Sequence, residues 1–242
     1  MSVRRAGVVG AGGCNPPRVI NTPLLPALQS AQLTDAPRGL WPLQETSGAT
    51  AFDASGNGRD GTYSGGTQGA AAIGGNGSAS YTAGLVTIPY ASWLDATSWT
   101  CEILVYPTTL GNYSPMGRNS SGRGILWLWT ATGGVNYWYN TNGAGYYSPN
   151  GSTGLSNTTP YLLAARWDKA GATCSMWRNG VSVASVSNNG DSADTPDTVG
   201  LLLGDCRAGS YGWLGRISFA AYYGSALSDA RLLAHAQAAG LA

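Results

Sequence analysis

Short stretches in which apolar and polar residues alternate run along the chain from about residue 78 to residue 223, between clusters of glycine, serine and asparagine. At 99–105, one face collects Trp99, Cys101, Ile103 and Val105. Such alternation is typical of half-buried β-strands. Strands are expected at 78–82, 85–89, 99–107, 125–130, 135–140, 161–168, 173–178, 181–186, 199–204 and 213–223. Because no helices alternate with them, the pattern predicts an all-β antiparallel sandwich.

Two turns have strong local signals. Asn179-Gly180 separates two expected strands and predicts a two-residue type I′ hairpin. The run at 53–62 holds Asp53, Asn57 and Asp60 among three glycines. Because Asx side chains form hydrogen bonds with nearby backbone and glycine accepts positive φ, we expect this run to form a loop of fixed shape.

A single helix is predicted near the C-terminus, at 228–239. Ser228 is a favoured N-cap, and Leu227 and Leu232 are spaced as a hydrophobic staple. His235, the only histidine, is spaced to share a helix face with Arg231, so we expect it on the surface.

Composition narrows the function classes. Only 10% of residues are charged, 36 are glycine, and the net charge of +1 argues against nucleic acid as a partner. The chain is long for a disulfide scaffold, so we expect reduced thiols at all four cysteines. These are Cys14, Cys101, Cys174 and Cys206.

Residues 1–38 contain five prolines and no regular apolar period, which predicts an extended N-terminal arm. We expect the arm to be ordered by other chains, as an assembly segment. Its apolar anchors would be Val8, Val9, Val19, Ile20, Leu24, Leu25 and Leu28. The apolar run after Arg4-Arg5 is too short and glycine-rich for a signal peptide, and no membrane segment is expected.

The residues at 39–48 (GLWPLQETSG) lead into the 53–62 loop, followed by the strand at 99–107, the Asn179-Gly180 hairpin and a closing strand and helix. This order resembles a laminin-G-like, concanavalin-A-like jelly roll, which would span 39–242. The resemblance also implies a structural calcium ion near Asp53, Asn57 and Asp60. Since Gly215 and Thr82 stand where relatives are expected to carry ligands, we expect metal-free turns and no cofactor.

Catalysis is not expected. Glycoside hydrolysis needs two carboxylates about 5–9.5 Å apart. The glucanases that share the resemblance carry a Glu-x-Asp-x-Glu strand, and neither Glu45 nor Glu102 lies in that pattern.

Aromatic residues offer a candidate carbohydrate site. Trp127, Trp129, Tyr137 and Tyr139 alternate on two adjacent expected strands. They face outward if Leu126 and Leu128 face the core, and the reverse assignment makes them core residues, which we favour because so large an exposed patch would be unusual.

Two functions remain open at this stage. An extended arm, reduced thiols and no catalytic set favour a structural protein of a bacteriophage particle, because such jelly rolls resemble head-decoration and tail-appendage modules. Its partners would be other virion proteins or further copies, bound through the arm, and its location the virion, after synthesis in the host cytoplasm. The alternative is a carbohydrate-binding module for host-surface or matrix glycans, at an extracellular surface.

Overall fold

The fold is described from a computed structural model of the chain. It describes residues 26–74, 80–109, 111, 113–120, 123–129, 135–141, 145–147, 149–151, 154–189, 199–206, 209 and 211–242. For residues 80–83, 119–120, 123–129, 135–141, 145–147 and 150–151 it describes the backbone alone. No described helix has the length and apolar character needed to span a membrane.

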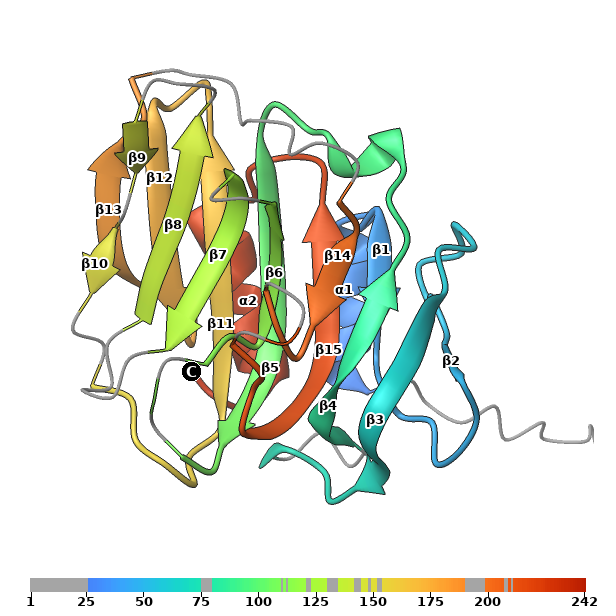
Figure 1. The fold of residues 1–242 in the computed structure, drawn as a ribbon. Coiled ribbons are helices and arrows are strands. Elements are labelled where there is room, and N and C mark those ends of the chain that lie inside the picture. Colours follow the sequence, from blue (N-terminus) through green and yellow to red (C-terminus); the bar gives the residue numbers. More distant parts are fainter. Residues whose placement is uncertain are drawn as a thin grey trace, which may run out of the picture.

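The described strands form two packed antiparallel layers, as the alternating pattern predicts (Figure 1). The front layer has the order β10-β8-β7-β6-β14-β4, with β9 on β8 and with β3 and β2 beyond β4. Its strands are β2 (Thr50–Ala51), β3 (Gly61–Ala70), β4 (Ser80–Ile88), β6 (Met116–Ser120), β7 (Arg123–Trp129), β8 (Val135–Thr141), β9 (Gly145–Tyr147), β10 (Asn150–Gly151) and β14 (Leu201–Leu203).

The back layer has the order β15-β5-β11-β12-β13, with β1 on β15. Its strands are β1 (Gly39–Trp41), β5 (Trp99–Pro107), β11 (Tyr161–Asp168), β12 (Thr173–Arg178), β13 (Val181–Ser187) and β15 (Gly215–Tyr223). The two layers are joined by pairing of β15 with β4, at Arg216↔Thr82 and Ile217↔Tyr81.

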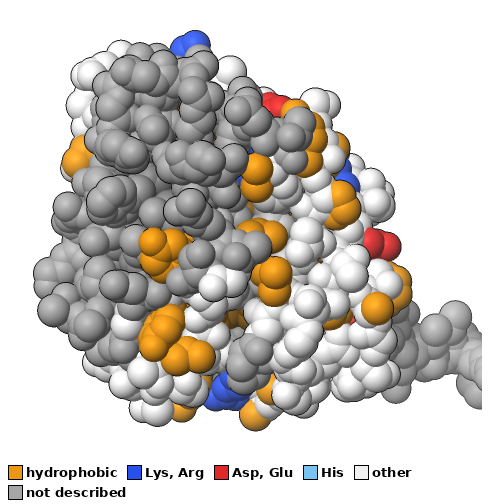
Figure 2. Space-filling model, in the orientation of Figure 1, with side chains coloured by type: hydrophobic (Ala, Val, Ile, Leu, Met, Phe, Trp, Pro, Cys, Tyr) orange, Lys and Arg blue, Asp and Glu red, His pale blue; other side chains and the backbone are white. Residues whose placement is uncertain are grey.

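The main core lies between the layers. Trp99, Cys101, Ile103 and Val105 of β5 are buried there, which confirms the predicted face. They meet front-layer residues such as Val86 of β4 and Leu203 of β14 in the same cluster. The front layer therefore turns one face to the core and the other outward, and the described part of this outward view carries scattered hydrophobic side chains among other types (Figure 2).

Two helices cover the far face of the back layer: α1 (Ala27–Thr34) and α2 (Asp229–Ala238) (Figure 1). A short 3₁₀ helix, Ser92–Leu94, precedes β5. Leu104 and Phe219 belong to a second buried cluster with Leu28 of α1 and Ala236 of α2. The back layer is thus apolar on both faces, and its two faces serve separate interiors.

An irregularity in β15 changes which of its residues face each interior. The pairing with β5 passes from Ser218↔Leu104 to Ala221↔Glu102, so β15 carries one extra residue there. Phe219 adopts a φ of +48° at this bulge. Its backbone N–H donates to Pro42 O at 3.2 Å, and its carbonyl accepts a hydrogen bond from Gln32 Nε2 at 3.3 Å.

Several predicted elements are confirmed. The strands β5, β11 and β12 have the expected bounds, and Asn179 and Gly180 have φ values of +50° and +76°, as a type I′ turn requires. Ser228 caps α2 by accepting a hydrogen bond from the N–H of Arg231 at 3.4 Å. The strands expected at 78–82 and 85–89 are one strand, β4, and β3 was not predicted.

The expectation of a wholly extended arm is wrong for residues 26–38. Helix α1 lies in this stretch, and Leu28 is 0% exposed within the chain's own second cluster. Leu28 therefore anchors α1 to its own domain and not to another chain. The other proposed anchors, Val8, Val9, Val19, Ile20, Leu24 and Leu25, lie outside the described residues.

Candidate functional site

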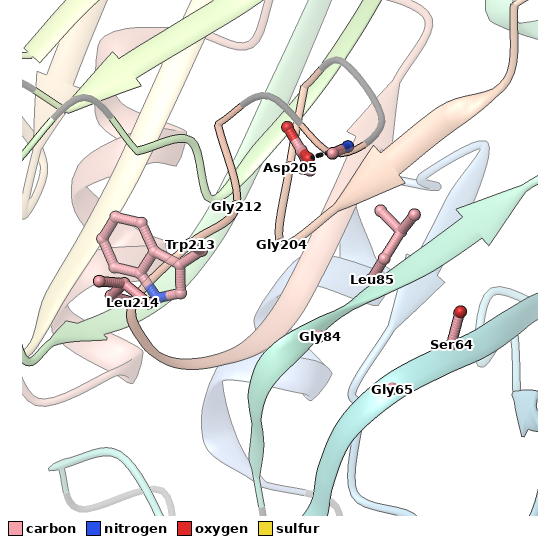
Figure 3. Close-up of a pocket in the computed structure, with 10 residues that line it drawn as sticks. Ser64, Gly65, Gly84, Leu85, Gly204, Asp205, Gly212, Trp213 and Leu214 are labelled. Atoms are coloured by element: carbon pink, nitrogen blue, oxygen red, sulfur yellow. Dashed lines mark hydrogen bonds between the residues drawn. The ribbon is translucent and has the colours of Figure 1, made fainter.

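A cleft of about 330 Å³ opens beside β3 and β4, under the segment that connects β14 to β15 (Figure 3). Leu85 alternates with the core residue Val86 in β4, so it lies on the outward face of the front layer. Side chains and glycine backbone line the cleft together. The lining residues are Ser64, Gly65, Gly84, Leu85, Gly204, Asp205, Gly209, Gly212, Trp213 and Leu214.

Glycine is required where β14 ends. Gly204 has a φ of +87°, and a Cβ there would lie 2.2 Å from the carbonyl oxygen of Gly84. The two backbones can therefore approach only with glycine at this position. Gly212, by contrast, has no heavy atom within 4 Å of an added Cβ. Space beside Gly212 is open.

Asp205 fixes the rim of the cleft. Asp205 is 3% exposed, and its carboxylate accepts a hydrogen bond from the N–H of Gly209 at 2.8 Å (Figure 3). The same carboxylate accepts hydrogen bonds from the N–H groups of Cys206 at 2.6 Å and Tyr211 at 3.3 Å. Trp213 is nearly buried, and its backbone N–H donates to Gly204 O at 2.8 Å. Leu214 is 37% exposed at the edge. The result is a shaped, mainly apolar hollow.

The Asp53 loop is held in a fixed shape by hydrogen bonds of its side chains, as its composition predicts. Asp53 Oδ1 accepts from the N–H groups of Leu40 and Ser55, and Oδ2 accepts from Ser55 Oγ and the N–H of Arg59, all within 3.0 Å. Asp60 Oδ1 accepts from the N–H of Asp53 at 2.8 Å. The amide of Asn57 donates to Pro37 O and Arg38 O. The carboxylate and amide groups of the loop thus bond to the backbone of the loop itself and to that of residues 37–40.

A second group of polar residues lies between the back layer and the helices. Glu102 and His235 are both 0% exposed, with Glu102 Oε2 2.8 Å from His235 Nδ1. His235 Nε2 lies 2.9 Å from Asp35 Oδ2, and Arg231 Nε donates to the same carboxylate at 2.9 Å. The expectation that His235 lies on the surface is therefore wrong. Helix α1 covers the face of α2 that carries His235.

The sequence model of the concanavalin A-like lectin/glucanases superfamily matches residues 80–232, well over half of the chain. The chain belongs to this superfamily. None of the curated protein sequences compared with it matches.

Solved structures share the superfamily fold. Domain 4 of AbnA, a GH43 extracellular arabinanase from Geobacillus stearothermophilus in complex with arabinotriose, aligns with a TM-score of 0.65 and 18% identity, covering 82% of this chain and 97% of that one. The binding domain of Paraclostridial mosquitocidal protein 1 has a TM-score of 0.62 and 12% identity, covering 84% of this chain and 52% of that one.

The Trypanosoma rangeli sialidase in complex with 2,3-difluorosialic acid has a TM-score of 0.58 and 14% identity, covering 82% of this chain and 32% of that one. This chain therefore spans about half of the mosquitocidal chain and about a third of the sialidase. At such identities the likeness shows the fold alone.

The superfamily name includes glucanases, so the position of the glutamates matters. Glu102 is buried under the helices on the far side of the back layer. Glu45 accepts hydrogen bonds from the N–H of Phe52 at 2.9 Å and the hydroxyl of Tyr63 at 2.7 Å. Neither lines the cleft, where Asp205 is the one carboxylate among the described lining residues. Among its described lining residues, the cleft therefore has no second carboxylate for a two-carboxylate mechanism.

The predicted aromatic site lies on β7 and β8. Their pairing sets Trp127 opposite Tyr137, with Trp129 and Tyr139 on the same sheet face. Pairing through β6 and β14 makes this the face of Met116 and Leu203, both of the core. The side chains of the four aromatic residues lie outside the described residues, so the aromatic site stays a prediction.

Proposed function

We propose that this chain is a non-catalytic carbohydrate-binding domain whose ligand occupies the cleft beside β3 and β4. The observation that carries the proposal is a cleft of fixed shape in a chain that belongs to a lectin and glucanase superfamily. Its volume of about 330 Å³ lies at the lower end of the range for small-molecule sites. A short oligosaccharide segment fits this size better than a long chain.

The chemistry of the lining suits sugar. Leu85 and Leu214 offer apolar contact to the C–H faces of a pyranose or furanose ring. Five of the lining residues are glycines, whose missing side chains let a sugar ring approach the backbone closely. The arabinotriose complex of the AbnA domain, which this chain covers almost completely, supports arabino-oligosaccharides as first ligands to test.

The test is a glycan screen followed by calorimetry on the full chain. Gly212→Leu adds a side chain to the cleft at a position without positive φ, so it should leave the fold intact and weaken binding at least tenfold. Ala230→Leu adds the same side chain at an exposed position of α2 and should bind like the wild type. Loss of binding in Trp127→Ala but not in Gly212→Leu would move the site to the aromatic strands. No binding to any glycan would refute the function.

A role as a structural component of a bacteriophage particle stays a prediction from the sequence. Co-purification with particles would test it, together with the predicted virion location and virion partners. We also propose that the domain lacks hydrolytic activity, because its cleft and its glutamates lie apart.

A further inference from the structure

His235 is the centre of a small charge network between α1, α2 and the back layer. Its two ring nitrogens face acceptors on opposite sides. Nδ1 lies 2.8 Å from Glu102 Oε2, and Nε2 lies 2.9 Å from Asp35 Oδ2 and 3.2 Å from Ala31 O. A neutral imidazole has one N–H donor and one lone pair. In the neutral form, one nitrogen would therefore turn a lone pair toward a carboxylate.

Among the described residues, the charged and titratable groups that face the His235 ring come from four elements. Glu102 comes from β5, Tyr223 from β15, Asp35 from the end of α1, and Arg231 from α2. Tyr223 stacks on the imidazole at 6.1 Å between ring centroids and donates its hydroxyl to Glu102 Oε2 at 3.2 Å. Burial, followed by the charge of Glu102, raises the pKa of Tyr223, so its hydroxyl stays protonated as a donor.

The charges of the network balance when His235 and Arg231 are protonated and both carboxylates are ionised. With Glu102 and Asp35 ionised and Arg231 charged, a protonated His235 gives two negative and two positive charges. Loss of the imidazole proton leaves a net negative charge next to a fully buried carboxylate. Burying an unpaired charge is strongly unfavourable, so the contact should then open.

We propose that protonated His235 latches α1 onto the domain, and that its deprotonation releases α1 while the two strand layers stay folded. The polar attachments of α1 run through this network. Gln32 donates to Glu102 Oε2 and Phe219 O at 3.3 Å, and Asp35 pairs with Arg231 and His235. The main core between the layers contains no residue of α1.

The direction of the pH effect follows from the environment of the ring. Burial alone would lower the pKa of His235, but the hydrogen bond and charge of Glu102, with the charge of Asp35, outweigh it and raise the pKa above 6.5. A raised pKa gives stability that is complete below about pH 6.5 and is lost as pH rises through the folded value. The latch is therefore closed below about pH 6.5 and opens as the pH rises through the raised pKa of His235.

Because the chain has one histidine, its imidazole Cε1–H signal can be followed by NMR without assignment of others. We expect one titration with a midpoint above 6.5 in the wild type. Asp35→Asn removes one carboxylate at a partly exposed position, 14% exposed, and should lower the midpoint. A wild-type midpoint at or below 6.5 would overturn the proposal, since the ring would then be neutral when bound.

Hydrogen exchange on the full chain from pH 6 to pH 10 tests the release itself. After correction for the intrinsic rate, amides of α1 should lose at least tenfold protection across the His235 titration, while those of β11 should keep theirs. His235→Gln should remove this pH dependence. If that variant does not fold, Asp35→Asn should shift the midpoint of the loss by the same amount as the NMR titration. Parallel loss in α1 and β11, or a loss that neither variant changes, would refute the latch.

Discussion

Leu28→Ala is the sharpest test of the way α1 is attached. Leu28 is 0% exposed and shares a buried cluster with Leu104, Leu162 and Phe219 of the back layer. Replacing a fully buried leucine with alanine removes apolar contact and leaves a cavity, at a cost of about 2–5 kcal/mol. Helix α1 lies at the edge of the fold and can relax, so we expect about 3 kcal/mol.

For a chain of this size, about 3 kcal/mol corresponds to a fall in Tm of roughly 6–12 °C. Urea unfolding followed by tryptophan fluorescence measures the same loss as a lower midpoint at constant slope. Leu233→Ala is the matched control, because Leu233 lies on α2 and is 38% exposed. It should stay within about 0.5 kcal/mol of the wild type.

An unchanged midpoint in Leu28→Ala would refute the packing of α1 on the domain. It would restore the expectation that the whole segment before residue 39 serves other chains. If the packing is correct, removal of residues 1–38 should destabilise the domain at least as much as Leu28→Ala.

Four further predictions address other features. Asp53→Ala leaves four donors without their carboxylate and should cost about 2–3 kcal/mol in urea unfolding, whereas Asp229→Ala, which breaks an exposed ion pair, should cost under about 1 kcal/mol. The Tm of the wild type should be the same in EDTA and in millimolar calcium, and a large calcium-dependent rise would show that the Asp53 loop binds an ion. Burial raises the pKa of the Cys101 thiol, and that of Cys174 to about 12, so peptide mass spectrometry should find both unalkylated at pH 8 until urea unfolds the chain, and rapid native labelling would contradict this burial. No β-glucan should be cleaved, and turnover that disappears in Glu102→Gln would refute the non-catalytic assignment.

The sequence was most informative where one local rule decides the structure. Alternation in β5 set its core face, and Asn179-Gly180 set the hairpin because few residues accept two successive positive φ values. Cys101 and Cys174 are free thiols, as expected, and Cys14 lies outside the described residues.

The sequence was least informative where contacts between distant segments decide. Helix α1 follows Pro26, has no side-chain N-cap and lies in a proline-rich stretch, so nothing local marks it. His235 was placed at the surface because Arg231 shares its helix face, yet Asp35 pairs with both. The cleft also escaped prediction, since its lining glycines come from three separate parts of the chain, which are β3, β4 and the segment between β14 and β15.

The extra residue in β15 has a consequence for the two tyrosines that end the strand. Without it, strict alternation from the core residue Ile217 would send Tyr223 into the main core and Tyr222 toward the helices. With it, Tyr222 reaches inward and donates its hydroxyl to Leu94 O at 2.7 Å, while Tyr223 reaches Glu102. Deleting the one extra residue would keep both tyrosines on these faces, whereas regular pairing of the full sequence, without a bulge, would exchange them and disturb both interiors at once. The bulge therefore sets the faces of every residue that follows it in β15, and it lies only a few residues after the cleft residue Leu214.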